Sequence, residues 1–161
     1  VKQEGTHLVY DSSQIPGEIL DTLAVNTATL KANPDFAKAL TGAWFETLAL
    51  MSKGDAASTA AKTQMARLSG TDLAGYESQL KTTKLFYTPQ DALAFATAPA
   101  LLASNDLVRK FSFDHGLLGE GAADADVIGI AFPGGKVLGD PQNIKLRFDA
   151  SFVQMAAEGK L

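Results

Sequence analysis

Residues 33–54 have the sequence NPDFAKALTGAWFETLALMSKG and contain the clearest structural element of the chain. Asn33 can cap a helix, and Pro34 suits its first position. Large apolar side chains then recur at spacings of three or four, which places them on one stripe of a helix. These are Phe36, Leu40, Trp44, Leu48 and Met51. Gly54 suits the end of such a helix, so the stretch predicts a helix over residues 34–53 with a buried apolar face.

More helices are predicted on the C-terminal side of this one. The second has an alanine-rich stripe and should therefore pack closely against a neighbour. The stripe consists of Ala57, Ala61, Met65 and Leu68. Thr71, Thr88 and Asp149 are expected to cap the third, fourth and last helices. The predicted helices cover residues 56–68, 71–80, 88–97, 99–116 and a final segment after residue 149.

Short apolar runs predict β-strands near both ends of the chain. They cover residues 6–10, 19–25, 127–132, 136–138 and 144–148. Pro133, Gly134 and Gly135 predict a turn between two of these runs, and residues 119–126 predict a surface loop. The sequence thus predicts a helix-rich α/β fold, with strands at the two ends and helices between them.

Composition excludes several classes of protein. The 161 residues include 14 Lys and Arg against 18 Asp and Glu, so the net charge is −4. Hydrophobic residues make up 46%, which is an ordinary composition for one folded domain. Nucleic-acid binding is not expected, because it requires a basic face. The chain has no cysteine, which excludes disulfides and thiolate nucleophiles.

The sequence contains no recognisable catalytic or metal-binding motif. Its two histidines, His7 and His115, lack the spacing of a zinc site. Residues 129–136, GIAFPGGK, differ from a phosphate-binding P-loop because glycine replaces the required lysine. We therefore expect neither an enzyme nor a bound metal or cofactor.

One polar cluster is the candidate binding site. Asp11, Ser12, Ser13, Glu18 and Asp21 lie close together in the sequence, between two predicted strands. In one interpretation they form an ordinary polar loop. In the other, the hydroxyls orient a small polar ligand and the carboxylates neutralise a cationic one. Spacing alone does not decide between these interpretations.

Four stretches of the chain resemble a known family. Residues 12–51 contain an NP…KAL..AW helix that resembles the solute-binding proteins of ABC importers in the nitrate/sulfonate/taurine and thiamine-precursor class. Three further stretches resemble the branch of this class that is associated with urea carboxylase and with urea- or guanidine-type transport. They are LFYTPQDALAF (85–95), FSFDHGLLGEGAADADVIGIAFP (111–133) and NIKLRFDASFVQMAAEGKL (143–161).

The resemblance implies a type II periplasmic-binding-protein (Venus-flytrap) fold, of which this chain would be the C-terminal portion. Residues 1–25 would end the second lobe and cross the hinge, and residues 26–161 would form the C-terminal part of the first lobe. The expected ligand contacts are Ser12, Ser13, Glu18 and Asp21, at the point where the chain crosses between lobes.

The function that the resemblance implies is capture of a small nitrogen-containing solute, such as urea or guanidine, in the periplasm. The partners would be permease subunits in the inner membrane and either the missing N-terminal portion of the protein or a second copy. Two alternatives remain open. One is an enzyme that acts on a thiamine-precursor pyrimidine, and the other is a helical interaction domain without a small ligand.

Overall fold

The computed structural model describes residues 4–15 and 17–161 and is mainly helical. Its α-helices are α1 (Thr27–Ala32), α2 (Pro34–Ser52), α3 (Ala56–Leu68), α4 (Leu73–Leu80), α5 (Pro89–Thr97), α6 (Pro99–Asp114) and α7 (Ser151–Ala157). Its strands are β1 (Gly129–Ala131), β2 (Val137–Leu138) and β3 (Ile144–Arg147), and short 3-10 helices cover Ser12–Gln14 and Pro133–Gly135. The fold is therefore a helix-rich α/β arrangement with one small sheet.

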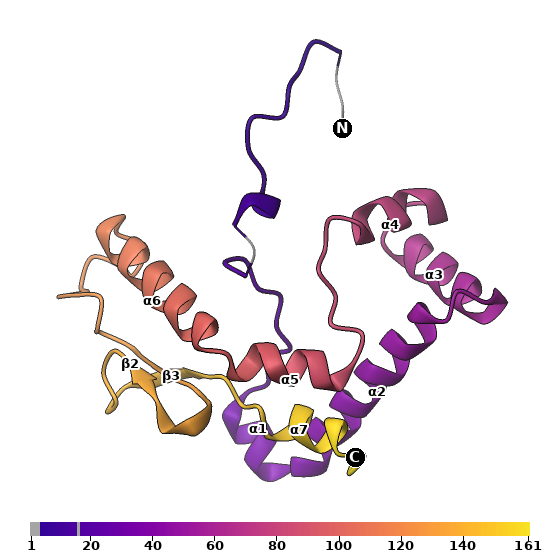
Figure 1. Ribbon diagram of the computed structural model, residues 1–161. Helices are drawn as coiled ribbons and strands as arrows, with labels where there is room; N and C mark the ends of the chain where they lie inside the picture. Colours follow the sequence, from indigo (N-terminus) through magenta and orange to yellow (C-terminus); the bar gives the residue numbers. More distant parts are fainter. Residues whose placement is uncertain (1–3, 16) are drawn as a thin grey trace.

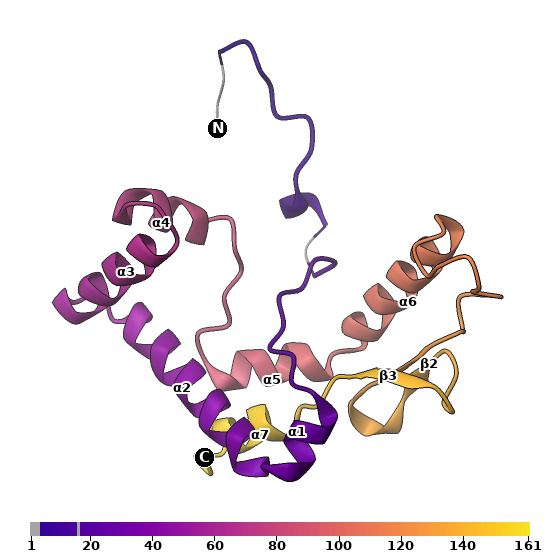
Figure 2. The same cartoon turned by 180° about the vertical axis from the view of Figure 1, so that it is seen from behind.

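The elements form an open cradle (Figure 1). Helices α1, α5 and α7 lie at its base, and α7 packs against both α5 and α2. One side consists of α2, α3 and α4, and the other consists of α6 and the sheet. The N-terminal segment, residues 4–15 and 17–25, rises from the base between the two sides, and its outer part extends away from the base in both views (Figures 1 and 2).

The sheet is mixed and has the order β2-β1-β3. β1 pairs antiparallel with β2 through the turn at Pro133–Gly135, and it pairs parallel with β3. The predicted strand–turn–strand structure of residues 127–138 is confirmed, although β1 is shorter than expected. Leu101 of α6 packs against Ile130 and Phe132 to form a small buried core, and Leu20 of the N-terminal segment covers part of it.

Most predicted helices are confirmed, and three of their predicted caps are wrong, among them Asp149, because the N-cap of α7 is Ala150. The structure places α2 and α3 within one residue of the expected bounds. The Asn33 side chain does not cap α2, because this residue already ends α1, a short helix that the sequence analysis missed. Asp72, instead of Thr71, caps α4 by accepting a hydrogen bond from the Gly75 N–H. Thr88 caps α5 as predicted.

Two predicted apolar faces are only partly buried. In α2, Leu48 and Met51 are buried, but Phe36 and Trp44 each remain 43% exposed. In α3, the buried residues are Ser58 and Ala66, whereas Leu68 of the predicted stripe is 75% exposed. These helices therefore have partners along only part of their length.

The strands predicted at residues 6–10 and 19–25 are wrong. Both stretches lack strand pairing, and they leave Leu8, Val9 and Ile19 largely exposed. A strand requires a neighbouring edge for its backbone hydrogen bonds, and neither stretch lies in the sheet of this structure. The expectation of strands at both ends of the chain is corrected accordingly: the sheet lies only in the C-terminal part.

The open arrangement exposes an unusually large surface. The accessible area is 11177 Å², whereas a compact monomer of this mass exposes roughly 7,700 Å². Among the described residues, no helix combines the length and the apolar character that crossing a membrane requires. Exposed large apolar side chains lie on the N-terminal segment and on α6, where they include Leu107, Val108 and Phe111.

Candidate functional site

Ser12 and Ser13 form a local turn in the middle of the N-terminal segment. They begin the 3-10 helix Ser12–Gln14, which Asp11 caps by accepting hydrogen bonds from the Ser13 N–H at 3.0 Å and from the Ser13 hydroxyl. Both bonds lower the pKa of Asp11, and the bond from the Ser13 hydroxyl has the larger effect. The Ser13 hydroxyl therefore serves to stabilise the turn, and both serines are exposed.

Glu18 and Asp21 lie further along the same segment and point in different directions. An extended chain places alternate side chains on opposite sides. Glu18, Leu20 and Thr22 line a groove against α6 and β3, whereas Asp21 does not line it and is exposed. The structure therefore brings only Glu18, of the four predicted ligand contacts, into a concave surface.

The groove is formed by three parts of the chain that are distant in sequence. Its volume is about 230 Å³, which is adequate for a small organic solute and too small for a nucleotide. It is lined by Glu18, Leu20, Thr22, Ser104, Asn105, Val108, Leu146 and Phe148. The groove is open to solvent, so a bound molecule would be only partly covered.

The polar atoms available in the groove are mainly hydrogen-bond acceptors. One N–H of the Asn105 side chain donates to the Leu101 carbonyl at 2.8 Å, which leaves its carbonyl oxygen and its second N–H available. The Glu18 carboxylate accepts only, and the hydroxyls of Thr22 and Ser104 can accept as well. Among the residues that the structure describes, neither lysine nor arginine lines the groove. This combination suits a small solute that is rich in N–H donors.

Sequence analysis missed the α6 and β3 side of this groove. Ser104 and Asn105 follow the apolar residues 99–103 in the helix predicted at residues 99–116, and this change to polar side chains was the available signal. No signal in the sequence placed Leu146 or Phe148 opposite Glu18, because that contact depends on how residues more than a hundred positions apart are brought together.

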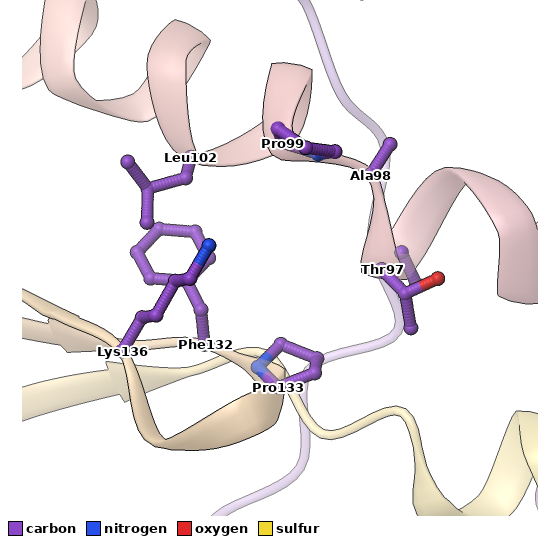
Figure 3. A pocket seen from close by; sticks show the side chains of 8 residues that line it. Thr97, Ala98, Pro99, Leu102, Phe132, Pro133 and Lys136 are labelled. Atoms are coloured by element: carbon purple, nitrogen blue, oxygen red, sulfur yellow. The ribbon is translucent and has the colours of Figure 1, made fainter.

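A second, smaller hollow lies at the first turn of α6. It is lined by residues of the α5–α6 junction together with Phe132, Pro133 and Lys136, as Figure 3 shows. Its volume is about 30 Å³, which is close to the space that one water molecule occupies in the liquid. The hollow is therefore too small for an organic ligand.

A cluster of charges beside the groove fixes the loop that follows α6. Arg109, which is largely buried, donates to Asp106 at 2.8 Å, to the Ala125 carbonyl at 3.1 Å and to Asp126. Burial lowers the pKa of Arg109, but the bonds to the two carboxylates outweigh it, so the net pKa is raised. Hydrogen bonds from Lys110 and Arg109 lower the pKa of Asp106. We call Asp106, Arg109 and Asp126 the Arg109 clasp.

The histidines take no part in the groove. His7 lies exposed in the N-terminal segment. His115 ends α6, where a ring nitrogen lies 2.9 Å from the Phe111 carbonyl and the ring stacks on Phe111 at 3.9 Å. Across residues 4–15 and 17–161, no three His, Asp or Glu side chains are grouped as metal ligands.

The groove beside Glu18 is thus the candidate site, and only the side chains that line it indicate which ligand it could bind. Comparison of the chain with models of protein families, with curated proteins and with solved structures finds no match in any of the three.

Proposed function

We propose that this chain is part of the solute-binding component of an ABC importer and binds a small nitrogen-containing solute, such as urea or guanidine. The groove beside Glu18 supports the proposal. It joins a carboxylate, an amide oxygen and two hydroxyls to an apolar wall that includes Phe148. A planar donor-rich solute could bond to Glu18 through paired N–H groups, as arginine does to carboxylates, while its face rests on the aromatic ring.

The open side of the groove supports a two-lobed arrangement. A solute-binding site normally buries most of its ligand, whereas this groove is open to solvent and would cover a ligand only in part. In the proposed type II periplasmic-binding-protein fold, a second lobe would close over the groove, and residues 17–25 would form part of the connection between lobes. Closure on the solute would create the surface that permease subunits recognise in the periplasm. No bond of the solute is broken in this proposal.

A thermal-shift titration of the full chain with guanidinium and with urea tests the proposal. Ligand is added up to about 1 mM, and a ligand at 100 times its dissociation constant stabilises by roughly 2.7 kcal/mol. For a chain of this size that raises the melting temperature by several degrees. We expect a shift with guanidinium or urea, and we expect Glu18→Gln to abolish the guanidinium shift.

Glu120→Gln is the matched control, because Glu120 is an exposed carboxylate outside the groove. It should leave the shift unchanged. Equal loss in both variants would show a nonspecific charge effect and would count against the groove. A lack of any shift with either solute would contradict the proposed solute class.

A further inference from the structure

We infer that two copies of this chain associate by exchanging their N-terminal tips, residues 8–11, so that the tip of each copy adds as a strand to the free edge of β3 in the other. The inference concerns the chain itself and does not depend on a bound solute. Three observations carry it: the unpaired tip, the unpaired sheet edge with opposite charge, and the amount of exposed surface.

The tip has the character of a strand without a partner. Leu8, Val9 and Tyr10 favour extended structure, yet Leu8 is 77% and Val9 is 92% exposed. Figures 1 and 2 show this end of the chain projecting away from every helix and from the sheet. Among the described residues, none forms a ladder with the backbone of these three positions.

The outer edge of β3 is an unpaired strand edge to which such a segment could bond. Within the described chain, β3 pairs only with β1, so its other edge retains unpaired backbone N–H and carbonyl groups. An unpaired edge is a template for an added strand. The adjacent side chains Lys145 and Arg147 are both exposed and positive.

The charges of the two surfaces are complementary. Residues 4–25 contain four carboxylates and neither lysine nor arginine. One of these carboxylates, Asp11, immediately follows the apolar part of the tip. Lys145 and Arg147 at the receiving edge would attract an acidic strand and would repel a basic one. Charge therefore favours pairing of the tip with this edge over pairing of two β3 edges with each other.

The exposed area is sufficient for a stable dimer. The chain exposes roughly 3,500 Å² more than a compact monomer of its mass, whereas a typical specific interface buries about 800 Å² on each partner. An exchanged segment also closes on itself through a two-fold axis, which limits assembly to two copies. A second copy is thus the occupant that this surface fits.

Light scattering and cross-linking of the full chain test the inference. We expect a mass about twice 16.9 kDa at micromolar concentration, and we expect salt to weaken the dimer. Lys145→Glu with Arg147→Glu should weaken it at least about tenfold, because like charges then face each other. Leu68→Glu, on an exposed position of α3 far from the sheet, should leave the affinity unchanged.

The absence of native cysteine allows a direct test of the contact. A Val9→Cys chain mixed with a Lys145→Cys chain should form a two-chain product with a short bis-maleimide. Val9→Cys mixed with Leu68→Cys should not. A monomer at all concentrations overturns the inference, as does equal cross-linking to both positions. So does a Val9→Cys/Lys145→Cys chain that links within one copy at high dilution.

Discussion

The two sides of the cradle are held together in different ways. On one side, α2 and α3 pack against each other across a short turn, and the buried Ser58 hydroxyl donates to the Met51 carbonyl at 2.7 Å. On the other side, Leu101 of α6 packs against β-strand residues about thirty positions later. The first side depends on local contacts and the second on distant ones, so we expect the two sides to lose stability separately.

The largest expected effect is on the α6–sheet side, at Gly139. Its φ is +72°, and an added Cβ would overlap the backbone oxygen of Ile128. Gly139→Ala should therefore lower the free energy of unfolding by at least about 3 kcal/mol, measured by urea denaturation. Gly42→Ala is the control: Gly42 lies inside α2 with no atom near the added Cβ, so this change should stabilise by about 0.5–1 kcal/mol. Equal effects of the two changes would contradict the close approach at Gly139.

The next effect is a cavity in the core of the same side. Leu101 is buried beside Ile130 and Phe132, and truncation of such a leucine costs about 2–5 kcal/mol. Leu101→Ala should expose the amides of α6 and β1 to hydrogen exchange while those of α2 and α3 remain protected. Simultaneous loss of protection on both sides would show that the cradle unfolds as one unit and would contradict separate unfolding of the two sides.

A smaller effect is expected on the α2–α3 side. Ser58 is fully buried, and its hydroxyl satisfies a carbonyl in the last turn of α2. Ser58→Ala leaves that carbonyl without its partner, which should cost about 1–2 kcal/mol and should affect exchange in α2 and α3 only. Ser52→Ala is the matched control, because the Ser52 hydroxyl bonds to a carbonyl at an exposed position. That change should be close to neutral.

The smallest effect is a dependence on pH at the Arg109 clasp. The pKa of Asp106 is lowered by its bonds to Lys110 and Arg109. The carboxylate therefore stabilises the fold above its ordinary pKa of 3.8, and this contribution is lost as the pH falls through the lowered value. NMR signals of residues 119–127 should shift in that range. Asp106→Asn should give similar shifts at neutral pH, and unchanged signals in this variant would contradict the clasp.

The helices could be predicted from the sequence because a helix forms its backbone bonds within one segment. Pro34, Gly54 and Thr88 marked helix boundaries within a residue or two. The burial of Phe36 and Trp44 could not be predicted in the same way, because apolar spacing predicts which face would pack but not whether a partner covers it. The predicted strands of the C-terminal part are confirmed, both beside the turn at Pro133–Gly135 and at β3, which pairs with β1 without a tight turn.

The candidate site could be predicted only on one side. Glu18 was identified from a local cluster of polar residues, and the structure places it in the groove. Ser12 and Ser13 belonged to the same cluster, but in the structure they form a turn capped by Asp11 and do not line the groove. Asn105 could not be paired with Glu18, since that contact depends on the crossing of the N-terminal segment over α6.

The packing of Leu20 also determines how late in synthesis the core on the α6–sheet side can form. The core that it packs against, Leu101, Ile130 and Phe132, lies up to roughly 110 residues later in the chain. A ribosome adds about 5–20 residues each second, so Leu20 is made some 6 to 22 seconds before the last of these core residues. During that interval α2 and α3 can already close on each other through Ser58. Leu20 therefore remains exposed until the last of these core residues has been made.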